Sequence, residues 1–390
     1  MVRSTIGTAY LEPDPKRLLM TRRILGVNAI RLVENVGGVG RVIEAILNGM
    51  DRVSHPFDEI KVYSPAPISS EVSLPASITQ VVVPSWLPPA AWEQFSLPAA
   101  HGSHDLLLCP SYVAPIFARC PMLLIHHGSY EGVPIQYSFW RMMKARIAYQ
   151  ASAHRAPLIA TVSEHSKKKI EQFYGVSNSK VVVVPNGVDR NVFRPIKDLA
   201  HLRAWRQKTL GADQPFIVYV GRPDLRRNTP NLINAFAEAK HEYELPHKLV
   251  FIGTSFQRVP LDDLIEQSGM QHDIVCIPYA SHDEIATAFN AAEMSVYPSL
   301  YEGFGMPVLE AMACGAPTIT MNNTAFPEFA GGAAILLDNA DVSTLKSAMV
   351  ELHNDPGKRH AMSAAGIERA RAYDWDKITK KYVELMSRLI

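Results

Sequence analysis

The chain has 390 residues, of which 47% are hydrophobic and 20% are charged, with 39 basic and 38 acidic side chains. A single hydrophobic core rarely grows beyond about 250–300 residues, so this length predicts two domains. The ordinary apolar fraction excludes a mainly disordered chain. The near-neutral charge argues against a protein that coats nucleic acid, so no nucleic-acid partner is expected.

The first half of the sequence alternates between strand and helix patterns. The first strand candidate covers residues 24–32 and leads into a glycine-rich loop at residues 37–41, after which helical spacing begins. This order is the opening unit of a doubly wound α/β domain. Further short apolar runs, typical of strands buried on both faces of a parallel sheet, follow at residues 81–83, 106–108, 122–125, 158–162 and 180–184.

The second half repeats this alternation after a turn signal at residues 186–189. It predicts a helix over residues 230–240 and strands at residues 216–220, 249–253, 274–277 and 294–297. We place the interdomain linker near residues 186–200. The expected parts are an N-terminal domain at residues 1–190, a C-terminal domain at residues 191–372 and an amphipathic helix at residues 373–390.

The four cysteines do not form a disulfide framework, and buried thiols in a reducing compartment are the simpler interpretation. His101, His104 and Cys109 have the composition of a loose zinc site, but a structural zinc site needs four well-spaced ligands. The sequence has no run of about 18 apolar residues, and its first twenty residues contain no apolar segment of a secretion signal. We therefore expect a cytoplasmic protein.

The most informative segment covers residues 297–315, where a predicted strand ends in a loop and a helix follows. Gly303 and Gly305 lie in the loop, where the absence of Cβ leaves the backbone free. Pro307 suits the first position of the helix, because its missing N–H would be unpaired there. The N–H groups from about Gly305 to Leu309, with the helix dipole behind them, predict an anion site whose natural occupant is a diphosphate.

Two carboxylates frame this helix start: Glu302 precedes the glycines, and Glu310 is expected in the first helical turn. A carboxylate beside a diphosphate would repel it, so each should contact hydroxyl groups, and a ligand with hydroxyls on both sides of a diphosphate is a nucleotide sugar. The alternative is that Glu310 only stabilises the helix dipole and Glu302 is a solvated loop residue. In the loop at residues 221–228, Arg222 and Arg227 could hold phosphate oxygens of a leaving diphosphate.

Together these motifs resemble those of the retaining GT-B glycosyltransferases of family 4. The resemblance extends from about residue 24 to residue 390, and its most specific part is the segment from Glu302 to Glu310 with its Gly-Phe-Gly-Met-Pro interior. It implies the GT-B fold, in which two Rossmann-like doubly wound domains face a central cleft and the last helix crosses back to the N-terminal domain. The other matching pieces are residues 37–41, 125–128, 161–166, 185–189 and 221–228.

The resemblance also implies roles for donor-binding residues. Glu310 would bind the ribose of the nucleotide, and Glu302 would bind hydroxyls of the donor sugar. Arg222 would bind the diphosphate, as would Arg227, which stands where the family usually has lysine. Further donor contacts are implied for the loop and helix start, the base-binding segment and a glycine across the cleft, at Phe304, Gly305, Met306, Val308, Leu309, Ile277, Tyr279 and Gly38.

Family members usually carry one histidine near the transferred sugar. His126 and His127 are adjacent here, and we favour His126 because it follows the strand directly. The resemblance then places Gly37, Gly38, His127 and Ser163 on the acceptor side. The residues expected at the reacting atoms are His126, Glu302, Arg222 and Arg227.

The resemblance implies transfer with retention of anomeric configuration and no metal or other cofactor. Asp374-Trp-Asp376 spells the metal-binding D-x-D of another transferase fold, but its place in the tail favours helix capping. GDP-mannose is the expected donor, and a saccharide or lipid-linked molecule is the expected acceptor, in the synthesis of a surface polysaccharide.

Other classes of function stay open. An NAD-dependent oxidoreductase would need a G-x-G-x-x-G motif, but counted from Gly38 the third glycine position is Ile43. A non-catalytic sugar-nucleotide-binding protein is less compatible with the paired glutamates and arginines. A phosphorylase of the same architecture would need a lysine for pyridoxal phosphate, which the sequence does not place.

A basic and aromatic segment at residues 137–149 contains Arg141, Lys144 and Arg146. Together with the lysines at residues 167–169, it could rest on an anionic membrane at the inner face of the plasma membrane, near a lipid-linked acceptor. The alternative is a helix with one face in the core and a basic face in solvent.

Overall fold

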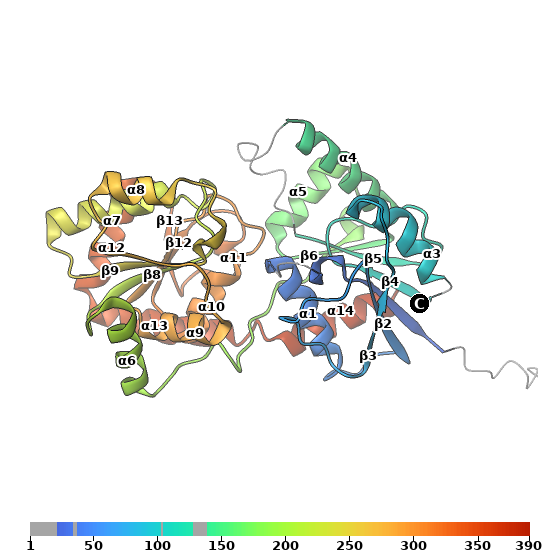
Figure 1. Ribbon diagram of the computed structural model, residues 1–390, viewed down its shortest axis with the longest axis horizontal. Coiled ribbons are helices and arrows are strands. Elements are labelled where there is room, and N and C mark those ends of the chain that lie inside the picture. Colours follow the sequence, from blue (N-terminus) through green and yellow to red (C-terminus); the bar gives the residue numbers. More distant parts are fainter. Residues whose placement is uncertain (1–21, 34–36, 103, 128–138) are drawn as a thin grey trace, which may run out of the picture.

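The computed structural model describes residues 22–33, 37–102, 104–127 and 139–390. Its two halves lie side by side, and each contains one parallel sheet covered by helices (Figure 1). The predicted architecture of two doubly wound domains is therefore confirmed. Of the segments discussed above, the first twenty residues, Gly128 and residues 137–138 lie outside the described residues.

The N-terminal half is built on a seven-stranded sheet in the order β3-β2-β1-β4-β5-β6-β7. Val27 pairs with Val62 on one side and with Leu108 on the other, and all three side chains are buried. The strands are β1 (Ile24–Asn28), β2 (Glu59–Ser64), β3 (Ile78–Val82), β4 (Leu106–Cys109), β5 (Met122–His126), β6 (Leu158–Thr161) and β7 (Val181–Val183). The α-helices are α1 (Gly38–Met50), α2 (Pro89–Ala91), α3 (Leu97–His101), α4 (Phe139–Arg155) and α5 (Glu164–Tyr174).

The structure corrects the predicted strands of this sheet in three places. The first strand ends at Asn28, and residues Ile30–Leu32 form a 3₁₀ helix instead of continuing it. The strand predicted at residues 81–83 is β3, which is partly exposed because it lies at the edge of the sheet. β2 has no counterpart among the predicted strands, because its sequence mixes charged and apolar residues instead of forming an apolar run.

The C-terminal half is built on a six-stranded sheet in the order β10-β9-β8-β11-β12-β13. The strands are β8 (Phe216–Val220), β9 (Lys248–Ile252), β10 (Ile274–Ile277), β11 (Met294–Tyr297), β12 (Thr318–Met321) and β13 (Ile335–Leu337). The α-helices of this half are α6 (Leu199–Leu210), α7 (Thr229–Tyr243), α8 (Leu261–Ser268), α9 (His282–Ala291), α10 (Met306–Cys314), α11 (Phe326–Ala330), α12 (Val342–Asn354) and α13 (Pro356–Ala370), and α14 (Trp375–Ser387) follows them in the chain. The helix predicted at residues 230–240 is α7, whereas β12 and β13 have no counterpart among the predicted strands.

The chain passes twice between the two halves, first between β7 and α6 and again just before α14. The two passages are joined, because the Val188 N–H donates to the Tyr373 carbonyl at 2.8 Å. α14 then packs beside α1, where Gly49 leaves room for Thr379 (Figure 1). The last helix of the chain is therefore part of the N-terminal half.

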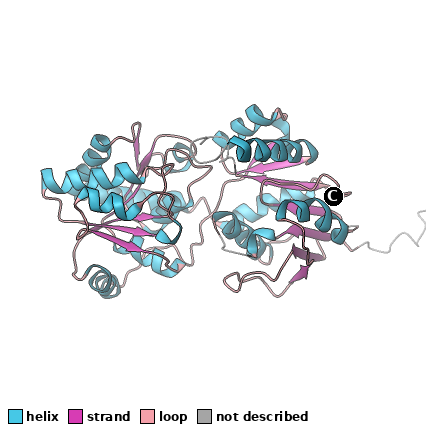
Figure 2. Cartoon of the chain, turned by 45° about the horizontal axis from the view of Figure 1, so that its top comes forward, coloured by secondary structure: helices cyan, strands magenta, loops and turns pink. Residues whose placement is uncertain are grey.

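The buried side chains form three clusters. One fills the C-terminal half, and the other two lie on opposite faces of the N-terminal sheet, between the strands and the flanking helices seen in Figure 2. Trp375 and Tyr382 of α14 belong to the same cluster as Leu25 and Ile43. None of the described helices has both the length and the apolar composition needed to cross a membrane.

Candidate active site

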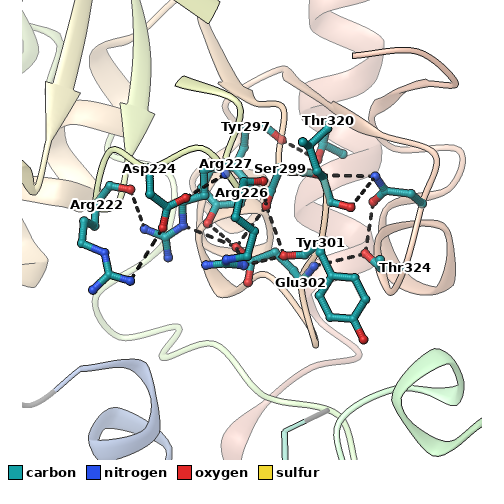
Figure 3. A network of polar contacts seen from close by, with 12 residues as sticks. Arg222, Asp224, Arg226, Arg227, Tyr297, Ser299, Tyr301, Glu302, Thr320 and Thr324 are labelled. Carbon is teal, nitrogen blue, oxygen red and sulfur yellow. Dashed lines mark hydrogen bonds and ion pairs between the residues drawn. The ribbon is translucent and has the colours of Figure 1, made fainter. Parts of the chain in front are cut away.

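The predicted site residues of the C-terminal half gather where its strands end. The loops that follow β8 and β11 bring Arg222, Arg227 and Glu302 into one polar network (Figure 3). In an open parallel sheet, ligands bind outside the carboxyl ends of the strands, so the topology itself places a site here.

Glu302 is the centre of this network, and four side chains contact one of its carboxylate oxygens. Arg226 lies 2.7 Å from Oε1, and Arg227 Nε lies 3.4 Å from it. The hydroxyls of Tyr297 and Ser299 donate to the same oxygen at 2.9 and 3.2 Å. Within the part of the chain that the structure describes, these contacts all use Oε1, so Oε2 can accept a hydrogen bond from a ligand.

The charges of this network are matched. Burial alone would raise the pKa of Glu302, but the guanidinium groups of Arg226 and Arg227 hold it below the usual value of a glutamate. Burial raises the pKa of Tyr297 well above its ordinary value, so this phenol keeps its proton and donates a hydrogen bond to Glu302. Glu302 is therefore a carboxylate at neutral pH and can accept hydrogen bonds from sugar hydroxyls.

The two predicted phosphate-binding arginines occupy different environments. Arg227 is mostly buried, with its guanidinium against Glu302 and the Arg222 carbonyl, which accepts from NH1 at 2.9 Å. Arg222 is more exposed, lies 3.7 Å from Asp224, and its Nε has no hydrogen-bond partner among the described residues. Of the two, Arg222 has the spare donor for a phosphate, whereas Arg227 holds Glu302.

α10 supplies the predicted helix start beside Glu302. Gly305 precedes it in the left-handed region, at φ 100°, and a Cβ there would lie 2.5 Å from the Phe326 ring. The helix has no side-chain cap; the Val308 N–H donates to the Gly305 carbonyl at 3.1 Å and Pro307 has no N–H, which leaves the Met306 N–H at the helix start for a ligand. Two details of the prediction are wrong: Pro307 is the second helical residue, and Glu310 is the fifth, beyond the first turn, because the helix begins at Met306.

Glu310 lies on α10 facing the N-terminal half, with only 3% of its surface exposed. Its Oε1 forms an ion pair with Arg41 of α1, and its Oε2 has no hydrogen-bond partner among the described residues. Both residues line an open cavity of about 430 Å³ between the halves, which His282 and Asp189 also line. A buried carboxylate oxygen without a partner beside a cavity is suited to a ligand hydroxyl.

The two adjacent histidines lie at the end of β5. His126 is fully buried among the rings of Tyr112, Tyr149 and Tyr174 at centroid distances of 5.0 to 5.6 Å. Burial lowers the pKa of His126 to about 3 and that of His127 to about 4, so both rings are neutral. The carbonyl of His127, rather than either ring, lies against Gly303. The catalytic role of His126 stays a prediction.

The loop that carries Glu302 is also held by the N-terminal half. A Cβ on Gly303 would lie 1.9 Å from the His127 carbonyl oxygen, so glycine is needed for this approach. Ser163, predicted on the acceptor side, donates to the Gly303 carbonyl at 2.8 Å. Beside it, Glu328 accepts from the N–H groups of Glu164 and His165 at 2.8 and 2.9 Å and so caps α5 from the other half.

The remaining predicted positions surround these groups. Gly37 precedes α1, and a Cβ on Gly38 would lie 3.4 Å from Met306 Cε, so the starts of α1 and α10 face each other. Ile277 ends β10, and Tyr279 in the following loop is 70% exposed. The other donor-loop residues, Phe304, Val308 and Leu309, are buried, which leaves their backbone as the part available to a ligand.

Two clusters have the composition of metal ligands. His247, Glu293 and His353 place their ligand atoms within 4.8 Å of one another, but both imidazoles bond Glu293 Oε1, and Arg359 lies 3.6 Å from the same oxygen. In the cluster considered for zinc, the rings of His101 and His104 are tilted against each other with their centroids 4.3 Å apart, and the thiol near His101 belongs to Cys120 instead of Cys109.

The tail motif is a helix cap. Asp374 accepts from the Asp376 N–H at 3.0 Å at the start of α14, and Asp376 pairs with Arg52 at 2.7 Å. The capping interpretation of the D-x-D sequence is therefore confirmed.

Arg41, Arg226 and Glu328 contact these groups although no role was predicted for them. Arg41 follows the Gly-x-Gly motif directly and Arg226 precedes Arg227, so both were within recognised motifs. The sequence around these two arginines does not reveal that Arg41 pairs with Glu310 and Arg226 with Glu302, because each pair joins distant parts of the chain.

Two protein-family models match the chain in series. The model described as Glycosyltransferase Family 4 matches residues 36–192, and the model described as Glycosyl transferases group 1 matches residues 203–369. O-antigen chain mannosyltransferase B of Escherichia coli is 28% identical over 248 residues, which cover 62% of this chain and 64% of that protein. The MMP alpha-(1->4)-mannosyltransferase of Mycolicibacterium hassiacum is 28% identical over 65% of this chain and 58% of its own length. The match thus spans less than two thirds of these relatives.

Solved structures show the same fold. Anabaena HepE in complex with UDP-glucose superposes with a TM-score of 0.77 at 18% identity, covering 94% of this chain and all of that one. Sucrose-phosphate synthase of Thermosynechococcus elongatus gives a TM-score of 0.76 at 19% identity, covering 94% of this chain and 99% of that one.

Proposed function

We propose that this chain, which belongs to the GT4-like glycosyltransferases of the GT-B fold, transfers a hexose from a nucleotide-diphosphate sugar to a saccharide or lipid-linked acceptor with retention of configuration. One observation carries the proposal. Glu302 and Glu310 lie on either side of an uncapped helix start, and each has one carboxylate oxygen held by arginine and the other left for a ligand.

The donor would extend from Glu302 to Glu310 with its diphosphate at the start of α10. Glu310 would accept from ribose hydroxyls, and Glu302 from hydroxyls of the sugar. The start of α10 and the guanidinium of Arg222 would bind phosphate oxygens. Loop residues near Ile277 and Tyr279 would hold the base.

In the reaction, the bond between the anomeric carbon and the phosphate oxygen breaks, and an acceptor hydroxyl forms a new bond on the same face. The acceptor's proton passes to the departing phosphate oxygen. The helix start and Arg222 stabilise the negative charge that develops there, so no metal ion is needed. Treatment with EDTA should leave the rate unchanged, and loss of activity that magnesium restores would contradict this part of the proposal.

The first donor to test is GDP-mannose, because two relatives are named as mannosyltransferases. A thermal-shift panel of GDP-, UDP- and dTDP-sugars tests the donor class directly, since a ligand that binds only the folded state raises the melting temperature. For the nucleotide sugar that raises the melting temperature most, release of the nucleoside diphosphate in the presence of the enzyme would then show turnover. A shift with NAD but with none of these sugars would favour an oxidoreductase instead.

The acceptor side includes a surface suited to a membrane. On α4, Trp140, Met143 and Ile147 are exposed at helical spacing, beside the exposed Lys144 and Arg146. An amphipathic surface with basic residues would bring the enzyme to an anionic inner membrane and to a lipid-linked acceptor of a surface polysaccharide. Flotation with anionic but not with neutral liposomes would support this, and flotation with neither would contradict it.

A further inference from the structure

We infer that the ribose end of the donor site is shared between the two halves: Arg41 of the N-terminal half positions Glu310 for the nucleotide. This inference rests on the proposed function and adds a residue to which neither the sequence motifs nor the fold assigns a role. Arg41 acts through Glu310 and is therefore a positioning residue.

The two residues meet along a line of contact between α1 and α10. Gly38 approaches Met306, and one turn further along both helices Arg41 meets Glu310. Met306 packs against the cores of both halves. The contact is therefore set by the backbones of two helices, and it forms only when the halves are together.

Glu310 depends on this partner because of its burial. Its side chain is 4% exposed, whereas that of Arg41 is 26% exposed and reaches solvent. A buried carboxylate without a counter-charge is strongly unfavourable and either takes up a proton or turns away. With Arg41 removed, Glu310 would lose the charge or the orientation that a ribose hydroxyl needs.

The ion pair also leaves a place for the ligand. Arg41 contacts Oε1, and the buried Oε2 has no hydrogen-bond partner among the described residues. Arg41 and Glu310 line the same cavity between the halves. Binding of ribose to Oε2 can therefore add to the ion pair instead of displacing it, and donor binding should favour the state in which the halves are together.

The test uses the full chain and isothermal titration with GDP and UDP in parallel. R41A should weaken binding of the nucleotide that the wild-type protein prefers by about tenfold, with the effect lost when Glu310 is already alanine. R41K should restore part of the affinity, because an ammonium can still pair with Oε1. Kinetics with the matching donor should show a raised donor KM and an unchanged acceptor KM.

R52A is the matched control. Arg52 lies in the turn just after the end of α1 and lines the same cavity, but it pairs with Asp376 at 2.7 Å instead of Glu310. R52A should bind the nucleotide as the wild-type protein does. An equal loss in R52A and R41A would mean a general effect of removing an arginine from this cavity and would overturn the inference.

Three other results would overturn it. If R41A tightens binding, Arg41 competes with the ribose. If R41A weakens binding equally in the presence and absence of Glu310, Arg41 acts on the ligand directly. If E310A weakens binding and R41A does not, Arg41 has no part in the site. By contrast, an E310A variant that binds normally, or a wild-type chain that binds neither nucleotide, would contradict the proposed function itself.

Discussion

The two glutamates that frame the start of α10 are held in different ways. Glu302 is fixed inside the C-terminal half by Arg226, Arg227 and two hydroxyls, all contributed by the loops after β8 and β11 and by the end of β11. Among the residues that the structure describes, Glu310 pairs with Arg41 alone, and that partner belongs to the other half. The sugar end of the proposed donor site is therefore ready in one half, whereas the ribose end depends on the approach of both.

This difference separates two kinds of contribution. Glu302 is fixed before the donor arrives and can act mainly on the reacting sugar. Glu310 reaches its final position only when the halves approach, so its contact with the ribose can couple donor binding to that approach. Variants of each glutamate and of the contacts between the halves should therefore change different kinetic constants.

The largest effect is expected for E302A. Loss of this carboxylate should lower kcat by about 100-fold, a loss of the size seen when a single preorganised group is removed from an active site. Donor KM should change little, because the ribose and phosphate contacts remain. R226A is the companion variant and should lower kcat less, since Arg227 still holds Glu302. Near-wild-type kcat in E302A would contradict the assignment.

A smaller loss of kcat/KM is expected for G303A, which tests the approach of the halves without replacing either carboxylate. The new Cβ would lie 1.9 Å from the His127 oxygen, so the halves must stay further apart. Because a misplacement of 1 Å can cost about 100-fold in rate, a fall in kcat/KM of about 30-fold is expected. Small-angle scattering should show a larger radius of gyration. An unchanged radius with normal kinetics would show that the loop absorbs the methyl group.

Next in size is E310A, which removes the ribose contact. A hydrogen bond to a charged group contributes about 1.5–3 kcal/mol, so the donor KM should rise about tenfold or more. Unlike E302A, this variant should keep most of kcat at saturating donor. If kcat falls instead while KM is unchanged, the roles of the two glutamates are reversed.

The smallest effect is expected for E328Q. The two α5 N–H groups bond different oxygens of Glu328, so the single amide oxygen of glutamine can accept from only one of them. The negative charge at that helix start is also lost, and such a charge contributes about 0.3–1 kcal/mol. Glu328 is exposed, so the penalty should shrink further as salt is raised. We expect kcat/KM to fall by about threefold at low ionic strength. A loss that does not depend on salt would point to geometry instead of charge.

The sequence predicted the fold and the C-terminal half of the site because both depend on local patterns. Apolar runs identified most central strands, and the segment from Glu302 to Glu310 contains its glycines and carboxylates within one loop and one helix. The strand β2 was not predicted, because its sequence mixes charged and apolar residues and so forms no apolar run. The arginine partners of the two glutamates were not predicted either. Arg226 lies 76 positions from Glu302 and Arg41 lies 269 positions from Glu310, and only the folded chain brings each pair together.

The position of α14 has a consequence for the way the protein is made. Its apolar face belongs to the core of the N-terminal half, next to strands that are synthesised hundreds of residues earlier. On the ribosome, that half must wait for the synthesis of α14 before its hydrophobic surface is covered. A stop codon before Trp375 would therefore destabilise the part of the protein that was translated first.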